Sequence, residues 1–198
     1  IDAAEELAMK FLNDPKVSSS DKALMLEMTA KHQADPKKSL PLWRAAIKTA
    51  KNPADKARMM YEVATGLERE GKFNEAITEY QSALKIASAK LKPYLLIGIA
   101  SCANRINRSD VALSAFSEIL KDHPNSELKP KAALRRAEIL IRSNKGAEAK
   151  KALEDVKRQF PKDPEWPRAL FYLGYINYAN NQWKPAIENL KVAANHPG

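Results

Sequence analysis

The sequence predicts an all-α protein built as a solenoid of helix-turn-helix hairpins, and three observations lead to this prediction. The sequence repeats itself at intervals of 36 or 37 residues. Each interval holds two amphipathic segments separated by a short turn. No segment alternates apolar and polar residues in the way that a half-buried strand does. The chain has 198 residues, of which 44% are apolar and 29% charged, so it is long and apolar enough to bury such a core.

The repeat is clearest in columns of residues that recur in register. The column that opens each second helix holds Ala76, Ala112, Ala149 and Ala186. Twelve residues before these positions, each first helix carries a small residue: Ala64, Ala100, Ala137 and Gly174. Four residues after them come the bulky residues Tyr80, Phe116, Leu153 and Leu190. Small residues allow the paired helices to approach closely, while the large ones fill the space between them.

Turn signals and prolines set the order of the hairpins. The turns between paired helices are expected at Gly71, Asn107, Asn144 and Asn180-Asn181. Pro93, Pro130 and Pro167 are expected in the first turn of successive first helices, where a missing N–H costs little. We therefore predict hairpins over residues 57–92, 93–129, 130–166 and 167–198, which together form one continuous solenoid.

The first third of the chain fits the repeat less well. Trp43 and Ala46 keep the register, but Glu27 occupies the small-residue column and Ser39 the column that opens the second helix. We predict a degenerate hairpin over residues 20–53, with helices at 20–31 and 40–51 and with Asp35-Pro36 in the turn. Residues 1–14 are predicted to hold the second helix of a preceding repeat, at 3–13. We expect the protein to continue beyond both ends.

These columns resemble those of the tetratricopeptide repeat (TPR) family. The resemblance rests mainly on Leu173-Gly174, on the run from Trp183 to Ile187 and on the run from Gly71 to Ile77. It implies a right-handed solenoid that acts as a protein–protein interaction scaffold and not as an enzyme. Asn177 and Arg136 depart from the family pattern.

The connectors resemble those of one group within this family. Pro124-Asn125-Ser126 and Pro161-Lys162-Asp163 accompany the long repeat interval, and both features are similar to those of TPR proteins of the bacterial cell envelope. This resemblance implies a role in envelope assembly and favours a periplasmic location, with the cytoplasm as the alternative.

The resemblance also implies where a partner binds, because the family binds peptides on the concave face lined by first helices. The candidate peptide-binding residues are Arg58, Tyr61, Tyr94, Arg105, Lys131, Arg135, Arg168, Phe171, Tyr172 and Tyr175. The same columns also contain Thr65, Ile97, Ser101, Leu134 and Glu138. Cations mixed with aromatic rings favour a protein or peptide partner with acidic side chains. The alternative for the tyrosine cluster is that it packs against a further repeat.

The charge balance leaves other partners open. The 33 Lys and Arg residues exceed the 24 Asp and Glu residues, for a net charge of +9. A basic helical-repeat module that binds nucleic acid is therefore one alternative function, and the interaction domain of a larger enzyme is another. Self-association through terminal repeats is a further possibility.

Catalytic, cofactor and metal sites have little support. The three histidines are far apart in the sequence, the glycines form no phosphate-binding loop, and the single cysteine, Cys102, is expected to be a buried apolar residue. The sequence therefore predicts no cofactor and no metal.

Overall fold

A computed structural model describes residues 10–196, and within that range the chain forms helices and turns but no strand. This confirms the all-α helical-repeat solenoid. The chain divides into two compact units, residues 1–108 and 109–198, which we call the N-terminal and C-terminal units. The predicted hairpin over 93–129 contains the boundary between them. That all the hairpins form one continuous solenoid therefore stays a prediction.

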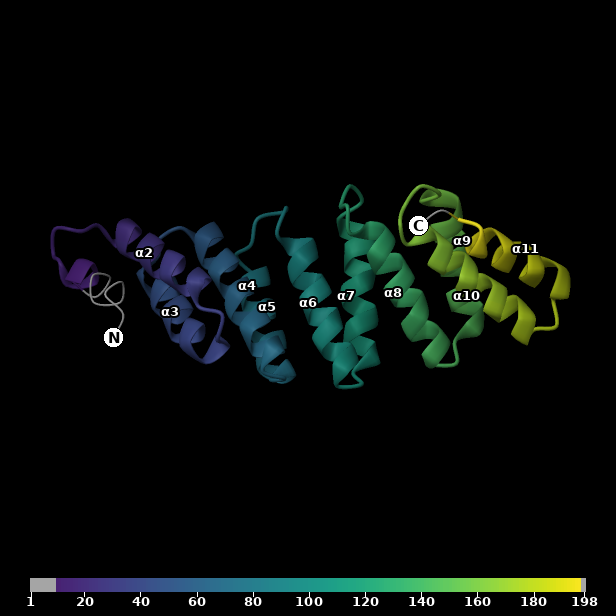
Figure 1. Cartoon of the computed structure of the whole chain (residues 1–198), viewed down its shortest axis with the longest axis horizontal. Helices are drawn as coiled ribbons and strands as arrows, with labels where there is room; N and C mark the ends of the chain where they lie inside the picture. The colour runs from purple at the N-terminus through teal and green to yellow at the C-terminus, as the bar shows by residue number, and fades with distance from the viewer. Residues whose placement is uncertain (1–9, 197–198) are drawn as a thin grey trace. The chain divides into compact units, whose positions relative to one another are not determined.

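The N-terminal unit contains α2 to α6, which lie side by side in chain order (Figure 1). Their bounds are α2 Ser19–His32, α3 Pro36–Thr49, α4 Pro53–Arg69, α5 Phe73–Leu84 and α6 Lys92–Arg105. Each helix packs against the next one, and α4 also contacts α6. The first helices of the hairpins are therefore neighbours along one side of this unit.

The C-terminal unit contains α7 to α11, with the same packing of each helix against the next. Their bounds are α7 Ser109–Asp122, α8 Lys129–Arg142, α9 Gly146–Gln159, α10 Trp166–Ala179 and α11 Trp183–Ala194. The core of this unit lies between α8, α9 and α10, where Leu134, Leu153 and Leu173 are fully buried. The first helices α6, α8 and α10 each carry proline near their start, as the sequence predicts.

Four equivalent turns join first helices to second helices. Gly71, Asn107, Asn144 and Asn181 adopt φ angles between 57° and 75°, the left-handed region that glycine and asparagine tolerate best. At each turn the N–H one residue later donates to a carbonyl of the preceding helix. Three examples are Lys72 to Leu67 at 2.9 Å, Lys145 to Leu140 at 2.8 Å and Gln182 to Asn177 at 2.9 Å. This closure satisfies a carbonyl that the helix end leaves open, and it confirms the predicted turns.

Close helix approach explains the small-residue columns. A Cβ atom on Gly174 would lie 2.6 Å from Cγ of Leu190 on the paired helix. Ala64, Ala100 and Ala137 at the equivalent positions have no exposed surface. Gly98, outside these columns, is even tighter, because a Cβ there would lie 2.4 Å from the ring of Tyr80.

The degenerate hairpin differs from the prediction at its second helix. This helix begins at Pro36, four residues before the predicted start, so Asp35-Pro36 is the helix start and not a free turn. The Asp35 side chain accepts a hydrogen bond from the Lys37 N–H at 2.9 Å, and proline follows it at the first helical position. An aspartate cap followed by proline is a strong start signal. Most of the predicted helix over 3–13 lies outside the described residues. Its described part, residues 10–13, is helical.

Candidate functional site

A cavity of about 510 Å³ lies between α4 and α6 in the N-terminal unit. Three candidate residues predicted from the sequence line it: Arg58 and Tyr61 from α4 and Tyr94 from α6. Lys90, in the connector that leads into α6, lines the same cavity, although the sequence prediction did not include it. The connector brings Lys90 next to α4. A comparison of equivalent helix positions between repeats does not detect this proximity, because Lys90 lies outside the helices.

Arg58 is held in place by Glu27 of α2. Both terminal nitrogens of the guanidinium group, Nη1 and Nη2, contact the Glu27 carboxylate, and the distance from Nη2 to Oε2 is 2.8 Å. Lys31 also contacts Glu27, at 2.7 Å, and Asp55 lies 3.5 Å from Arg58 Nη2. The hydrogen bond from Arg58 is the main reason that the pKa of Glu27 is lowered to about 2. Arg58 is thus pre-oriented by an ion pair, while 40% of its side chain stays exposed.

A second cavity of about 170 Å³ lies on the α2 side of this ion pair. Arg58 and Asp55 line both cavities, so these two side chains form a wall that the two cavities share. Leu24 of α2 lines the smaller cavity and is 54% exposed. An extended segment that crosses α2, α4 and α6 would therefore meet an aliphatic side chain, then a charged pair, then tyrosines.

The tyrosines form the apolar part of the larger cavity. The Tyr61 ring lies 5.8 Å from the ring of the buried Tyr80, at an angle of 55°. Burial is the main reason that the pKa of Tyr61 is raised, so its hydroxyl stays protonated at neutral pH. Arg105 does not line the cavity. It lies in the last turn of α6, with its guanidinium 5.9 Å from the centre of the Phe73 ring.

In the C-terminal unit, the predicted cations surround a carboxylate. Arg135 contacts Glu138 Oε2 at 2.9 Å and Arg168 contacts Oε1 at 2.8 Å, while only 12% of the Glu138 side chain is exposed. Burial lowers the pKa of Arg168, but the hydrogen bond with Tyr172 and the charge of Glu138 outweigh it, and the net shift is upward. Lys131 is exposed on the same helix as Arg135. Glu138 lies three residues after Arg135, a spacing from which the pair could have been predicted.

The aromatic candidates of α10 do not all share one environment. Phe171 and Tyr175 are 52% and 53% exposed, whereas Tyr172 packs against the core and meets Phe171 edge to face at 5.6 Å. The expectation that Leu134 lies on a binding face is wrong. Leu134 has no exposed surface, because it belongs to the core that α8 and α9 form with α10.

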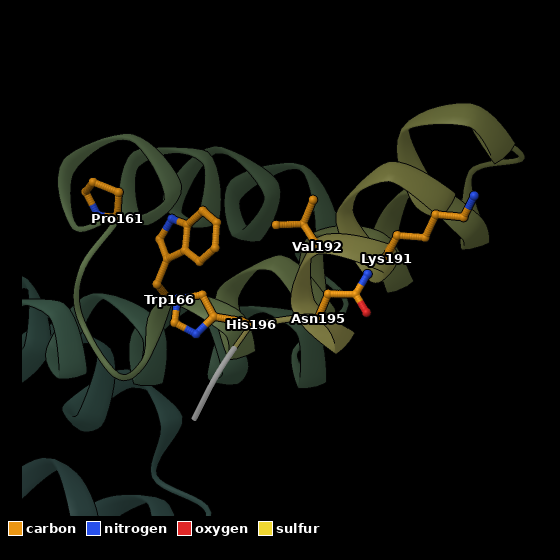
Figure 2. Close-up of a pocket in the computed structure, with 6 residues that line it drawn as sticks. All are labelled: Pro161, Trp166, Lys191, Val192, Asn195 and His196. Carbon is orange, nitrogen blue, oxygen red and sulfur yellow. The ribbon is translucent and has the colours of Figure 1, made fainter.

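A further cavity of about 470 Å³, which the sequence did not indicate, lies where the start of α10 meets the end of α11 (Figure 2). Its lining is Pro161, Trp166, Lys191, Val192, Asn195 and His196. The ring centres of Trp166 and His196 are 5.4 Å apart, and Trp166 Nε1 donates to the Lys157 carbonyl at 3.0 Å. The indole N–H is therefore used within the fold.

The cavities of the described residues are suited to non-covalent binding. Between residues 10 and 196, no three His, Cys, Asp or Glu side chains come together in a way that could hold a metal ion. Cys102 is buried, and burial is the main cause that raises the pKa of its thiol to about 12, so it is not a nucleophile at neutral pH. No helix in the described range is long and apolar enough to cross a membrane.

Solved structures with a similar fold include three named proteins, whose sequences are only 15–18% identical to this chain. MamA 41-end from Desulfovibrio magneticus RS-1 is 15% identical, with a TM-score of 0.71 over 89% of this chain and 96% of that one. YrrB is 16% identical, with a TM-score of 0.64 over 97% and 91%. PilF of Pseudomonas aeruginosa is 18% identical, with a TM-score of 0.67 over 91% and 77%. At sequence identities this low, the structural similarity shows only that these proteins share the fold.

Comparison with sequence families agrees with the repeat columns. A search of curated protein sequences gives no significant match. Two family models described as "Tetratricopeptide repeat" match residues 107–170 and residues 168–198. The helix pairs, their recurring left-handed turns and these matches lead to one conclusion: the chain carries tetratricopeptide repeats over residues 107–198.

Proposed function

We propose that this protein is an interaction scaffold that binds an extended partner peptide in the cavity between α4 and α6. The fold supports protein or peptide binding in general. The observation that supports this particular site is the cavity of about 510 Å³, in which Tyr61 and Tyr94 are combined with the cations of Arg58 and Lys90. YrrB, which has a similar fold, is described as a TPR protein with an unusual peptide-binding site.

The cavity chemistry favours a peptide with an apolar side chain next to an acidic one. Tyrosine rings bury apolar surface at little cost in conformational entropy. Lys90 is exposed and is free to move toward a carboxylate, whereas Arg58 is already oriented by Glu27 and keeps 40% of its side chain exposed. An ordered arginine loses less conformational freedom when it contacts a ligand than a mobile one does. The peptide therefore anchors on the rings and is selected by the two cations.

The cation cluster of the C-terminal unit is a weaker part of this proposal. Arg135 and Arg168 share Glu138, so much of their charge is balanced inside the protein. The same pairing reduces support for nucleic-acid binding by this cluster, because Arg135 and Arg168 share one carboxylate and have less free charge for phosphates. The two arginines and one glutamate leave this cluster a net positive charge, to which exposed Lys131 adds, and this makes the cluster a secondary contact for an acidic segment.

A library of random peptides displayed on phage, selected against the whole chain, tests the proposal. We expect selected peptides to combine acidic residues with aromatic or aliphatic ones. The variants Lys90→Glu and Tyr94→Ala should each weaken a selected peptide at least tenfold. Lys85→Glu, an exposed charge reversal just after α5, is the matched control and should leave affinity within twofold. Selection of neutral or basic peptides, or equal binding by all three variants, would refute the proposal.

We place this scaffold in the assembly of the bacterial cell envelope. The support is the resemblance of its repeat interval and of its connectors, such as Pro124-Asn125-Ser126, to those of envelope TPR proteins. Fractionation of bacterial cells that express the protein from its own gene tests this placement. Recovery with periplasmic or membrane markers is expected, and recovery only with cytoplasmic markers would contradict it.

A further inference from the structure

The two cavities of the N-terminal unit are one feature that the repeat produces twice. The smaller cavity lies between α2 and α4, and the larger one lies between α4 and α6. Leu24 of the smaller cavity lies 37 residues before Tyr61 of the larger one. In the connectors, Asn52 lies 36 residues before Ser88. Because these separations equal the repeat interval, the two cavities occupy equivalent places on neighbouring first helices.

Helix packing sets the distance between the two cavities. The helix α4 contacts α6, and Arg58 of α4 forms an ion pair with Glu27 of α2. The axes of packed helices lie about 8–10 Å apart, so equivalent points on successive first helices are separated by about this distance. Arg58 and Asp55 line both cavities, so only the start of α4 separates one cavity from the other.

A peptide in the polyproline II conformation matches this distance. It has three residues per turn and rises about 3.1 Å per residue, so side chains i and i+3 point the same way and lie about 9.3 Å apart. Side chains on one face of a β-strand are about 6.6 or 13.2 Å apart, which is too short or too long. An α-helix reaches both cavities only with residues i and i+7, about 10.5 Å apart, and its residues i+3 and i+4 would then press on the wall formed by Arg58 and Asp55. Polyproline II is therefore the regular conformation that fits.

Each cavity is suited to one apolar side chain. The smaller cavity has a volume of about 170 Å³, and its lining includes Leu24 and Met59. A cavity of about 150 Å³ holds one benzene molecule, so this volume accepts a single side chain. The larger cavity presents the rings of Tyr61 and Tyr94. Grooves lined by aromatic rings are the surfaces on which polyproline II segments dock in other domains.

Lysines at one edge of the unit favour an acidic segment. The connectors after α3 and α5 each join a second helix to the next first helix, so both lie at the same edge. Lys51 is exposed in one connector and Lys90 in the other, and each lines one cavity. In polyproline II the residues between i and i+3 point to the sides, so a carboxylate there meets these lysines. This charge complementarity favours an acidic segment of another protein over a second copy of this basic chain.

We propose that the two cavities together bind an acidic segment of another protein in the polyproline II conformation. The segment carries apolar side chains at i and i+3 and an acidic residue between them. One apolar side chain fills the cavity between α2 and α4, and the other fills the cavity between α4 and α6. This inference rests on the proposed function, because it specifies the sequence and the conformation of the peptide that the same site binds.

Three labelled heptapeptides of identical composition test the spacing, by fluorescence anisotropy with the whole chain. They are Glu-Leu-Pro-Glu-Leu-Pro-Glu, Glu-Leu-Pro-Leu-Glu-Pro-Glu and Glu-Leu-Pro-Glu-Pro-Leu-Glu, in which the leucines are three, two and four residues apart. We expect the first peptide to bind at least fivefold more tightly than either of the others. Replacing both of its prolines by alanine should weaken binding about threefold or more, because a less ordered peptide loses more conformational freedom on binding.

A double-mutant cycle assigns each leucine to its cavity. Leu24 is 54% exposed, so Leu24→Asp should leave the circular dichroism spectrum unchanged while it weakens the first peptide at least tenfold. Both single leucine-to-glycine peptides are also measured, since the peptide can run in either direction. The peptide that lacks the leucine of the smaller cavity should lose less than twofold in Leu24→Asp, because the contact is already absent. Ile187→Asp on α11, at a site that is 52% exposed, is the matched control and should change affinity less than twofold.

A peptide selected from the phage library is the reference that separates this inference from the proposed function. If that peptide depends on Tyr94 but the first heptapeptide does not bind, or binds no better than the other two, this inference fails and the proposed function stands. If the reference peptide binds Tyr94→Ala as well as the unmodified chain, both fail. Equal binding of the alanine peptide, or an additive double-mutant cycle, would also overturn the inference. So would dimers in sedimentation velocity that disappear in Leu24→Asp, because they would show that a second copy occupies the cavities.

Discussion

The ion pair between Glu27 and Arg58 should stabilise the N-terminal unit in a pH-dependent way. The pKa of Glu27 is lowered from 4.5 to about 2, chiefly by the hydrogen bond from Arg58. At 1.36 kcal/mol per pKa unit, the full shift corresponds to about 3 kcal/mol of stability at neutral pH. Because 40% of the Arg58 side chain is exposed, solvent screens part of this energy. We therefore expect Glu27→Gln to lower the free energy of unfolding by about 1–2 kcal/mol at pH 7.

The sign of the pH dependence follows from the direction of the shift. A carboxyl group with a lowered pKa in the folded state contributes its full stability above its unfolded pKa, near 4.5, and loses it as the pH falls toward 2. The difference in unfolding free energy between the unmodified protein and Glu27→Gln should thus be largest at pH 7. It should fall to less than about half of that value by pH 3. Urea unfolding followed by circular dichroism at pH 7, 5, 4 and 3 measures this difference.

Two further variants separate the ion pair from other effects. Arg58→Met, combined with Glu27→Gln in a double-mutant cycle, should show a coupling energy of about 1 kcal/mol. Asp55→Asn removes the more distant carboxylate, 3.5 Å from Arg58 and 49% exposed, and should cost less than about 0.5 kcal/mol. A stability difference for Glu27→Gln that stays constant from pH 7 to pH 3 would refute the reasoning, because it would show that packing and not charge causes the loss.

Three other perturbations have specific expected outcomes. Gly98→Leu should destabilise the protein by about 1–3 kcal/mol in thermal or urea unfolding, because even a Cβ would lie 2.4 Å from the Tyr80 ring; a variant as stable as the parent would show that this approach is looser. Cys102 should resist iodoacetamide at pH 8 in the folded protein and react in urea, since burial raises the pKa of its thiol to about 12; mass spectrometry would reveal rapid labelling of the folded protein as the contrary result. Replacing Arg135 and Arg168 together by glutamate should lower the unfolding free energy by about 1–2 kcal/mol, because both contact one nearly buried carboxylate; an unchanged melting curve would mean that the two arginines are functionally free cations.

Much of the fold could be predicted because helical hairpins depend on local signals. The turns at Gly71, Asn107 and Asn144 use residues that tolerate positive φ, and such signals act over a few residues. The column of Ala64, Ala100 and Ala137 could be predicted because the paired helices of every repeat approach each other closely at this position. The start of α3 lies four residues before the expected position, because aspartate followed by proline fits a turn as well as a helix cap in the sequence pattern.

The candidate site could be predicted only in part. Arg58, Tyr61 and Tyr94 were correctly assigned to neighbouring first helices, and they line one cavity. Lys90 was missed because it lies in a connector, whose path depends on the packing of the helices around it. Leu134 was misplaced because a column on a helix faces solvent or protein according to which helix covers it.

By itself, the sequence determined the helical class, the interval of the repeat, the turns and the small residues at helix contacts. These features follow from local conformational preference and from periodic burial, both of which a linear pattern records. Only the tertiary structure decided which charges of different helices are paired and which apolar residues stay exposed. Arg168 of α10 contacts Glu138 of α8, and Phe171 is exposed where Leu134 is buried, because these outcomes depend on side chains of different helices brought together by packing. The neighbours of a side chain in space determine whether its charge is paired and whether its surface is buried. A linear pattern does not record these neighbours.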